Sequence, residues 1–193
     1  RELRIDPASV LVNASHCHGI VRPDVDRLTV EAIRNAFNAL TPVKVGVGTG
    51  REDRVMENRR MKLKSGREAD VRHAYSLPPD DQVVSVGPID PEIGVLRFDR
   101  PDGTTVAVLY NYAGHPIQGV PSGGNTADVT GFASQVIEDN LPAGAVALFV
   151  QGCGGDINPV LYKYVYLPRD ARPLGQQLGL STLQAVRQIV PQE

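Results

Sequence analysis

Hydrophobic residues recur along the first fifty positions in short runs whose spacing alternates between strand and helix. β-Branched runs over residues 9–13 and 43–47 predict two buried strands, the second closed by the glycines between Gly46 and Gly50. Between these runs, Pro23 and Asp24 begin a predicted helix that ends at Thr41-Pro42. Apolar residues at helical spacing mark its expected core face: Val30, Ile33, Phe37 and Leu40.

The second half of the chain repeats this alternation. Residues 93–99 and 104–112 alternate like strands around the turn Arg100-Pro-Asp-Gly103, which predicts a β-hairpin. A helix over 130–139, a buried strand over 145–150 and a helix over 172–190 follow, with Phe132, Val136 and Ile137 facing inward on the first helix. The alternation of elements predicts a single layered α/β domain over residues 1–193, with a mixed β-sheet flanked by helices.

Residues 51–90 form a long polar insertion that is rich in charge, Pro and Gly and poor in periodicity. Loops of this length are uncommon in compact domains and are often functional. The segment is therefore either a lid or wall over a site, a partner contact, or a solvated insertion.

Composition then narrows the class of protein. The chain has 193 residues, 41% of them hydrophobic, and a net charge of −2, which gives no sign of a nucleic-acid binder. Neither a signal peptide nor an apolar run approaching the ~20 residues of a membrane span is present. Because the chain starts at Arg1 and moves directly into a strand-like run, we expect a fragment or a processed chain, and localisation stays open.

Three histidines are candidate metal ligands. His16 and His18 are two positions apart, which in an extended segment directs both imidazoles to the same face. Such a pair either shares a metal or forms a hydrogen-bonded pair under a loop. His115 lies between Gly114 and Pro116, where it is either a third member of the site or a loop cap, and His73 in the polar insertion is expected at the surface.

A glycine-rich segment over residues 152–159 follows the last predicted strand. Such a loop turns backbone N–H groups toward an anion or oxyanion, with Gly154 and Gly155 as the expected contacts, or it is a tight turn. Asp156 is a candidate base or metal-orienting group, and Asn158 a candidate oxyanion donor. Cys153 is a candidate nucleophile, although a small buried apolar residue is the commoner role of a cysteine, and this holds for Cys17 as well.

An arginine pair in the polar insertion is the last candidate. Arg59 and Arg60 are suited to hold a carboxylate or to polarise a carbonyl, unless they belong to a solvated basic patch.

The order of these motifs resembles the N-terminal catalytic domain of the neutral/alkaline, non-lysosomal ceramidase family. Ser15-His-Cys-His-Gly19 resembles its Thr-His-Thr-His-Ser-Gly motif, and Asn58-Arg59 its Asn-Arg motif. Asn111-Tyr-Ala-Gly-His-Pro116 resembles Asn-Phe-Ala-x-His-Pro, Ala127-Asp-Val-Thr-Gly-Phe132 resembles Ser-Asp-x-x-Gly-Tyr, and Gly155-Asp-Ile-Asn-Pro159 resembles Gly-Asp-x-Ser-Pro.

The resemblance implies a zinc-dependent hydrolase in which a zinc-activated water cleaves an amide (N-acyl) bond of a small-molecule or lipid substrate. By position, His16 and His115 are implied zinc ligands, His18 either lies behind these ligands or contacts substrate, and Arg59 helps to bind or polarise the substrate. Asn158 replaces the family serine, which excludes a serine nucleophile. The family's remaining ligands, a Glu and a Tyr, lie downstream of the matched region, so we expect further segments of the same protein as partners.

Two alternatives to this hydrolase remain open. The first is a non-catalytic ceramidase-like binding module, and the second is a Cys153-dependent hydrolase. Members of the family are often secreted or periplasmic.

Overall fold

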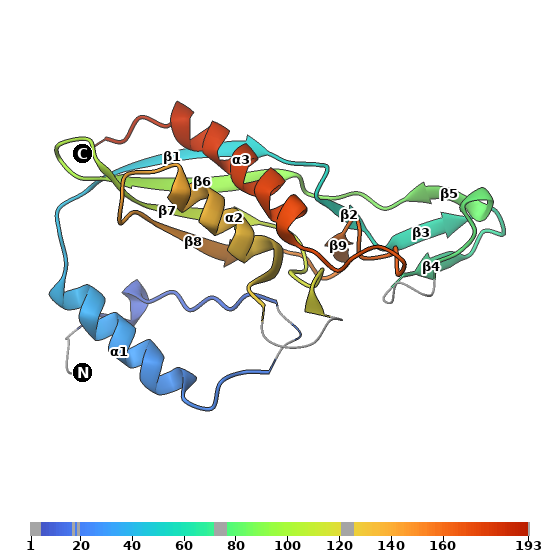
Figure 1. The fold of residues 1–193 in the computed structure, drawn as a ribbon, viewed down its shortest axis with the longest axis horizontal. Coiled ribbons are helices and arrows are strands. Elements are labelled where there is room, and N and C mark those ends of the chain that lie inside the picture. The colour runs from blue at the N-terminus through green and yellow to red at the C-terminus, as the bar shows by residue number, and fades with distance from the viewer. Residues whose placement is uncertain (1–4, 17, 19, 72–76, 121–125, 193) are drawn as a thin grey trace.

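A mixed four-stranded sheet forms the centre of the computed structural model, which describes residues 5–16, 18, 20–71, 77–120 and 126–192. Its strands are β1 (Lys44–Arg51), β6 (Glu92–Asp99), β7 (Thr105–Tyr112) and β8 (Val146–Gln151), in the order β1-β6-β7-β8 (Figure 1). The β1–β6 and β6–β7 pairs are antiparallel and β7–β8 is parallel. The expected hairpin and the predicted fold class, α/β with a mixed sheet flanked by helices, are confirmed.

Two helices, α2 (Asp128–Asp139) and α3 (Arg172–Gln188), cover one face of this sheet (Figure 1). They pack closely because α3 presents glycines to α2: a Cβ on Gly175 would lie 2.4 Å from the Phe132 side chain, and one on Gly179 would lie 2.8 Å from the Ala133 carbonyl. Ile137 and Leu178 are fully buried between the layers. The inward face predicted for the 130–139 helix is thus confirmed, with Ile137 buried and Phe132 and Val136 packed against the core.

Strand β1 does not end at its glycines, as the sequence pattern predicted, but runs through them. Gly46, Gly48 and Gly50 alternate along the strand and all face α3 and the segment after it, where a Cβ on Gly46 would lie 2.3 Å from the Ile189 side chain. These glycines therefore serve close packing within a strand rather than a turn.

The polar insertion is more regular than its sequence suggests. It contains β2 (Met56–Asn58), β3 (Arg60–Leu63), β4 (Glu68–Asp70), the 3-10 helix η3 (Asp80–Gln82) and β5 (Val83–Val86). Strands β4, β3 and β5 form a three-stranded sheet that extends from the main body (Figure 1), and β2 pairs with β9 (Ile157–Pro159). The strands are three or four residues long, too short for a period-two pattern to emerge from their charged sequence.

The N-terminal region is more exposed to solvent than the sequence pattern predicted. The strand expected at residues 9–13 is absent: a 3-10 helix, η1, covers Pro7–Ser9, and Leu11 and Val12 are more than 80% exposed. Helix α1 (Val25–Asn38) forms as predicted, but its expected core face is exposed, with Val30 at 54% and Phe37 at 39%. Ile33 and Leu40 are exposed too.

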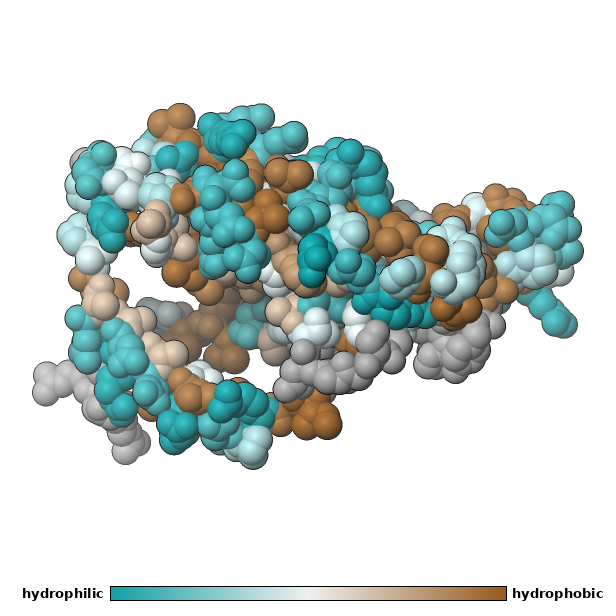
Figure 2. All heavy atoms as spheres, in the orientation of Figure 1, coloured by the Kyte–Doolittle hydropathy of each residue, from teal (hydrophilic) through white to brown (hydrophobic). Residues whose placement is uncertain are grey.

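The reason lies in the placement of α1 relative to the sheet. The helix stands apart from the main body, and Figure 2 shows hydrophobic surface in the hollow between them. On the uncovered sheet face Val47 and Leu148 are exposed, so the strand at 145–150 is buried on one side only. None of the helices in the described part of the chain is long and apolar enough to cross a membrane.

Candidate metal centre

His16, His18 and His115 meet at the end of the main sheet where β7 and β8 terminate. One ligand atom from each imidazole lies within 4.8 Å of the others. The Nε2 atoms of His16 and His18 are 3.1 Å apart, a distance at which the two rings either share a hydrogen bond or face one ion. His115 contributes the third ring, whose centroid lies 4.3 Å from that of His16. The donor set and its spacing fit a zinc ion.

The buried member of the cluster is His115, which is 3% exposed. Its backbone N–H donates to the Ile157 carbonyl at 2.9 Å, and its ring Nδ1 lies 3.0 Å from the same oxygen. Because a carbonyl only accepts, Nδ1 carries the proton and Nε2 keeps its lone pair. Burial lowers the pKa of His115 and the charges of His16 and His18 act in the same direction, while the hydrogen bonds that the ring makes to backbone carbonyls oppose this shift. The imidazole is therefore held neutral, as a metal ligand must be.

Glycines on two neighbouring strand ends let the segments of the site approach closely. A Cβ on Gly152 would lie 2.9 Å from the Tyr112 carbonyl carbon and oxygen. One on Gly154 would lie 2.7 Å from the Gly114 nitrogen, next to His115. Only residues without a side chain permit this distance. The described geometry gives Gly154 a packing role, while Gly155 faces open space.

Gln151, the last residue of β8, is a site residue that sequence reasoning missed. Its side-chain Oε1 accepts from the His16 N–H at 3.0 Å, while Nε2 donates to the carbonyls of Gly114 at 3.0 Å and Gly152 at 2.9 Å. The only sequence signal was its position, a polar residue between a buried strand and a glycine loop.

A cleft of about 630 Å³ adjoins the glycine-rich loop and is walled by β3 and the segment around β5. Asp156 lines it and accepts from Arg60 Nε at 3.3 Å and from Asn58 Nδ2 at 3.2 Å. The structure therefore brings together Arg60 and Asp156, two of the residues predicted for substrate binding and catalysis. The polar insertion supplies one wall of this cleft.

Arg59 and Asn158 lie in a different place from Arg60 and Asp156. Both line a small cavity together with Lys163, whose Nζ donates to Glu57 Oε2 at 2.7 Å. Arg59 forms an ion pair with Asp70 at 3.1 Å, and Asn158 is 5% exposed, with Nδ2 3.4 Å from the Val71 carbonyl. Arg59 lies between β2 and β3, whereas Arg60 is the first residue of β3, and the two side chains line different cavities.

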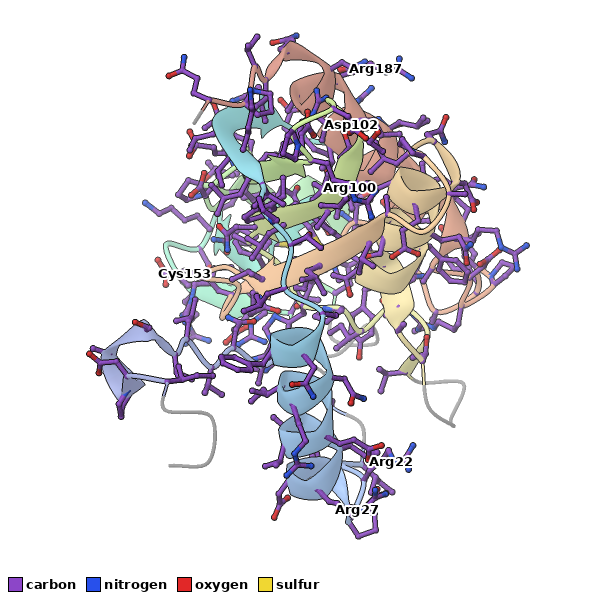
Figure 3. All side chains as sticks on the ribbon, turned by 90° about the vertical axis from the view of Figure 1, so that its left-hand side faces the viewer. Arg22, Arg27, Arg100, Asp102, Cys153 and Arg187 are labelled. Atoms are coloured by element: carbon purple, nitrogen blue, oxygen red, sulfur yellow. The ribbon has the colours of Figure 1, made fainter. Side chains whose placement is uncertain are left out.

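Cys153 is exposed and lies just past the end of β8 (Figure 3), where it lines the larger cleft beside Asp156. Within the described residues no histidine is hydrogen-bonded to its sulfur. The predicted positions Cys17, Gly19 and His73 lie outside the described residues.

Comparisons with known proteins place this arrangement in context. No family model and no curated protein sequence matches the chain. Among solved structures, it is similar to neutral ceramidase from Pseudomonas aeruginosa, with a TM-score of 0.62 and 20% identity over 85% of this chain and 26% of that one. A ceramidase complexed with C2 is also similar, with a TM-score of 0.61 and 20% identity over 82% of this chain and 25% of that one. The chain thus spans about a quarter of the length of these structures, and it has a ceramidase-like fold.

Proposed function

We propose that this chain carries part of the active site of a zinc-dependent hydrolase that cleaves an amide bond of an N-acyl substrate. The convergence of three histidines at the end of β7 and β8 carries the proposal. The likeness of the fold to ceramidases supports the reaction class. Zinc, when bound, supplies Lewis acidity that activates water toward an amide carbonyl.

His16 and His115 are the proposed ligands. The Ile157 carbonyl fixes the tautomer of His115. Because burial favours the neutral ring, His115 need not lose a proton when it binds a metal ion. To His18, whose Nε2 lies 3.1 Å from that of His16, we assign contact with the reacting amide or transfer of a proton to the leaving nitrogen.

The cleft beside the glycine-rich loop is the proposed binding site for the rest of the substrate. Arg60 and Asp156 supply polar groups on its wall, while Met61, Val86 and Ile89 supply apolar surface. This combination suits a molecule with both a polar head and a hydrocarbon part, such as an N-acyl lipid.

Metal content and hydrolysis test the proposal together. Zinc stoichiometry is measured on the wild type and on His16→Ala and His115→Ala, with His73→Ala as a matched control from the polar insertion. We expect one zinc per wild-type chain, loss of zinc in the first two variants, and retention in the control. A wild type that binds no zinc contradicts the proposal.

Hydrolysis is then followed with a fluorogenic N-acyl amide. His18→Ala is expected to retain zinc but lose most of the activity, because it removes a group beside the reacting bond rather than a ligand. Zinc binding without hydrolysis of any amide would favour a binding module instead. Unchanged activity in Cys153→Ala would exclude the cysteine as nucleophile.

A further inference from the structure

One side-chain amide connects the two segments that carry the proposed zinc ligands. Gln151 Oε1 accepts from the backbone N–H of His16, and Gln151 Nε2 donates to the carbonyl of Gly114, the residue directly before His115. In the sequence, Gln151 is separated from these partners by 135 and 37 positions.

The orientation of this amide is determined by its partners. Two carbonyl oxygens, those of Gly114 and Gly152, face one end of the amide, and an N–H faces the other. A rotation of the amide by half a turn would place oxygen against oxygen and donor against donor, so only one orientation forms all three bonds. The amide plane therefore fixes the distance between the His16 and Gly114 backbones.

Strand β8 holds Gln151 in place. The residue pairs with Tyr112 at the end of the parallel ladder, and the Gly152 N–H continues that ladder to the Tyr112 carbonyl at 3.0 Å. By contrast, the N-terminal segment has few contacts of its own: residues 10–16 are exposed and belong to no helix or strand. Its attachment at this point includes a second bond, from the Gln151 N–H to Asn13 Oδ1 at 3.1 Å.

We infer that Gln151 is a positioning residue, which holds His16 and His115 at the separation a shared metal ion requires. The inference rests on the proposed zinc site, but it also predicts a property of the metal-free protein. The edge contact between the His16 and His115 rings, whose centroids are 4.3 Å apart, should depend on Gln151. Removing a group that orients metal ligands typically lowers metal affinity by about 10- to 100-fold.

The test uses Gln151→Met, which keeps the length and most of the volume of the side chain but removes all three of its hydrogen bonds. The matched control is Gln135→Met, at an exposed position of α2 whose side chain donates to Asp139 Oδ1. In zinc-free protein, NMR cross-relaxation between the His16 and His115 rings reports their contact. Zinc affinity is measured by competition with a chelator, and the absorption spectrum of the cobalt-loaded protein reports ligand geometry.

We expect Gln151→Met to lose the ring contact and to weaken zinc binding about tenfold or more, with an altered cobalt spectrum, while Gln135→Met resembles the wild type. A ring contact that persists in Gln151→Met overturns the inference. If the wild type binds no zinc but Gln151→Met loses the contact, the proposed function fails and the positioning role stands. If Gln151→Met does not fold, Gln151→Glu, which keeps an acceptor for the His16 N–H but no donor for Gly114, decides by the same contact.

Discussion

Glu52 is a buried carboxylate whose charge should contribute measurably to stability. It is 1% exposed and lies between the end of β1 and helix α3. Arg54 donates to it from its backbone N–H at 2.8 Å and from its guanidinium at 2.9 and 3.1 Å. Ser181 donates at 2.6 Å and Gln177 at 2.9 Å, both from α3. The carboxylate thus joins the sheet to the helix that covers it.

Burial by itself raises the pKa of Glu52, but the hydrogen bonds from Arg54, Ser181 and Gln177 outweigh it and lower the pKa to about 2, from 4.5 in the unfolded chain. The charged form is therefore favoured by folding, and its contribution is fully present above pH 4.5 and lost as the pH falls through about 2. This difference in pKa corresponds to at most about 3 kcal/mol. Because the Arg54 side chain is 66% exposed, solvent screening reduces this to about 2–3 kcal/mol.

Glu52→Gln tests this contribution through the free energy of unfolding, measured by urea denaturation with a chelator present, between pH 7 and pH 2. We expect the variant to be about 2–3 kcal/mol less stable at pH 7, and the difference to shrink below about 1 kcal/mol near pH 2, where the wild-type carboxylate takes up a proton. The control is Glu31→Gln on α1, whose exposed pair with Arg27 should contribute less than about 0.5 kcal/mol. Parallel pH dependences of wild type and Glu52→Gln would refute the reasoning.

Three further predictions concern packing and hydrogen bonds around the sheet. Gly46→Ala should destabilise the protein by about 1–3 kcal/mol in thermal denaturation, because its Cβ would lie 2.3 Å from the Ile189 side chain. In the control Gly94→Ala the Cβ would lie 3.7 Å from its nearest neighbour, so the stability should stay within about 1 kcal/mol of that of the wild type. Tyr110→Phe should cost about 1 kcal/mol in urea denaturation, because its buried hydroxyl donates to the Thr130 carbonyl at 2.8 Å. Asp128 has a φ of +53° and its carboxylate accepts from three backbone N–H groups, so Asp128→Ala should destabilise the protein by about 2–4 kcal/mol in the same assay. Asp128→Asn should destabilise it clearly less, because Asn tolerates this backbone conformation and keeps one acceptor oxygen. Equal losses of stability in the two variants would contradict this account.

The sequence predicted the elements whose signals are local. The hairpin of β6 and β7 follows from alternation around the turn at residues 100–103, and α2 follows from apolar residues at helical spacing. The same rules misread the glycines of β1, because the reason for them is a helix more than 130 residues away in the chain. They also failed to predict the short strands of the polar insertion, which are defined by pairing: β3 pairs with β4 and β5, and β2 pairs with β9.

The candidate site shows a similar division. His16, His18 and His115 could be singled out as residues, and the spacing of the first two predicted a shared face. Their meeting at one point, and the separation of Arg60 from Arg59 into different cavities, required the three-dimensional arrangement. The role of Gln151 could not be predicted from the sequence, because its side chain forms hydrogen bonds with backbone atoms, which every residue type supplies.

What the sequence by itself determined is therefore helices α1, α2 and α3, the β6–β7 hairpin, strand β8, the α/β class and the identity of the histidines. Hydrophobic periodicity and turn residues act over a few neighbouring positions, and these elements and residues can be recognised from such local patterns. Only the tertiary structure decided which strand ends adjoin, which face of α1 stays exposed and how His16 reaches His115. These depend on contacts between positions far apart in the chain, such as the Gln151 amide between the His16 and Gly114 backbones, which no local pattern encodes.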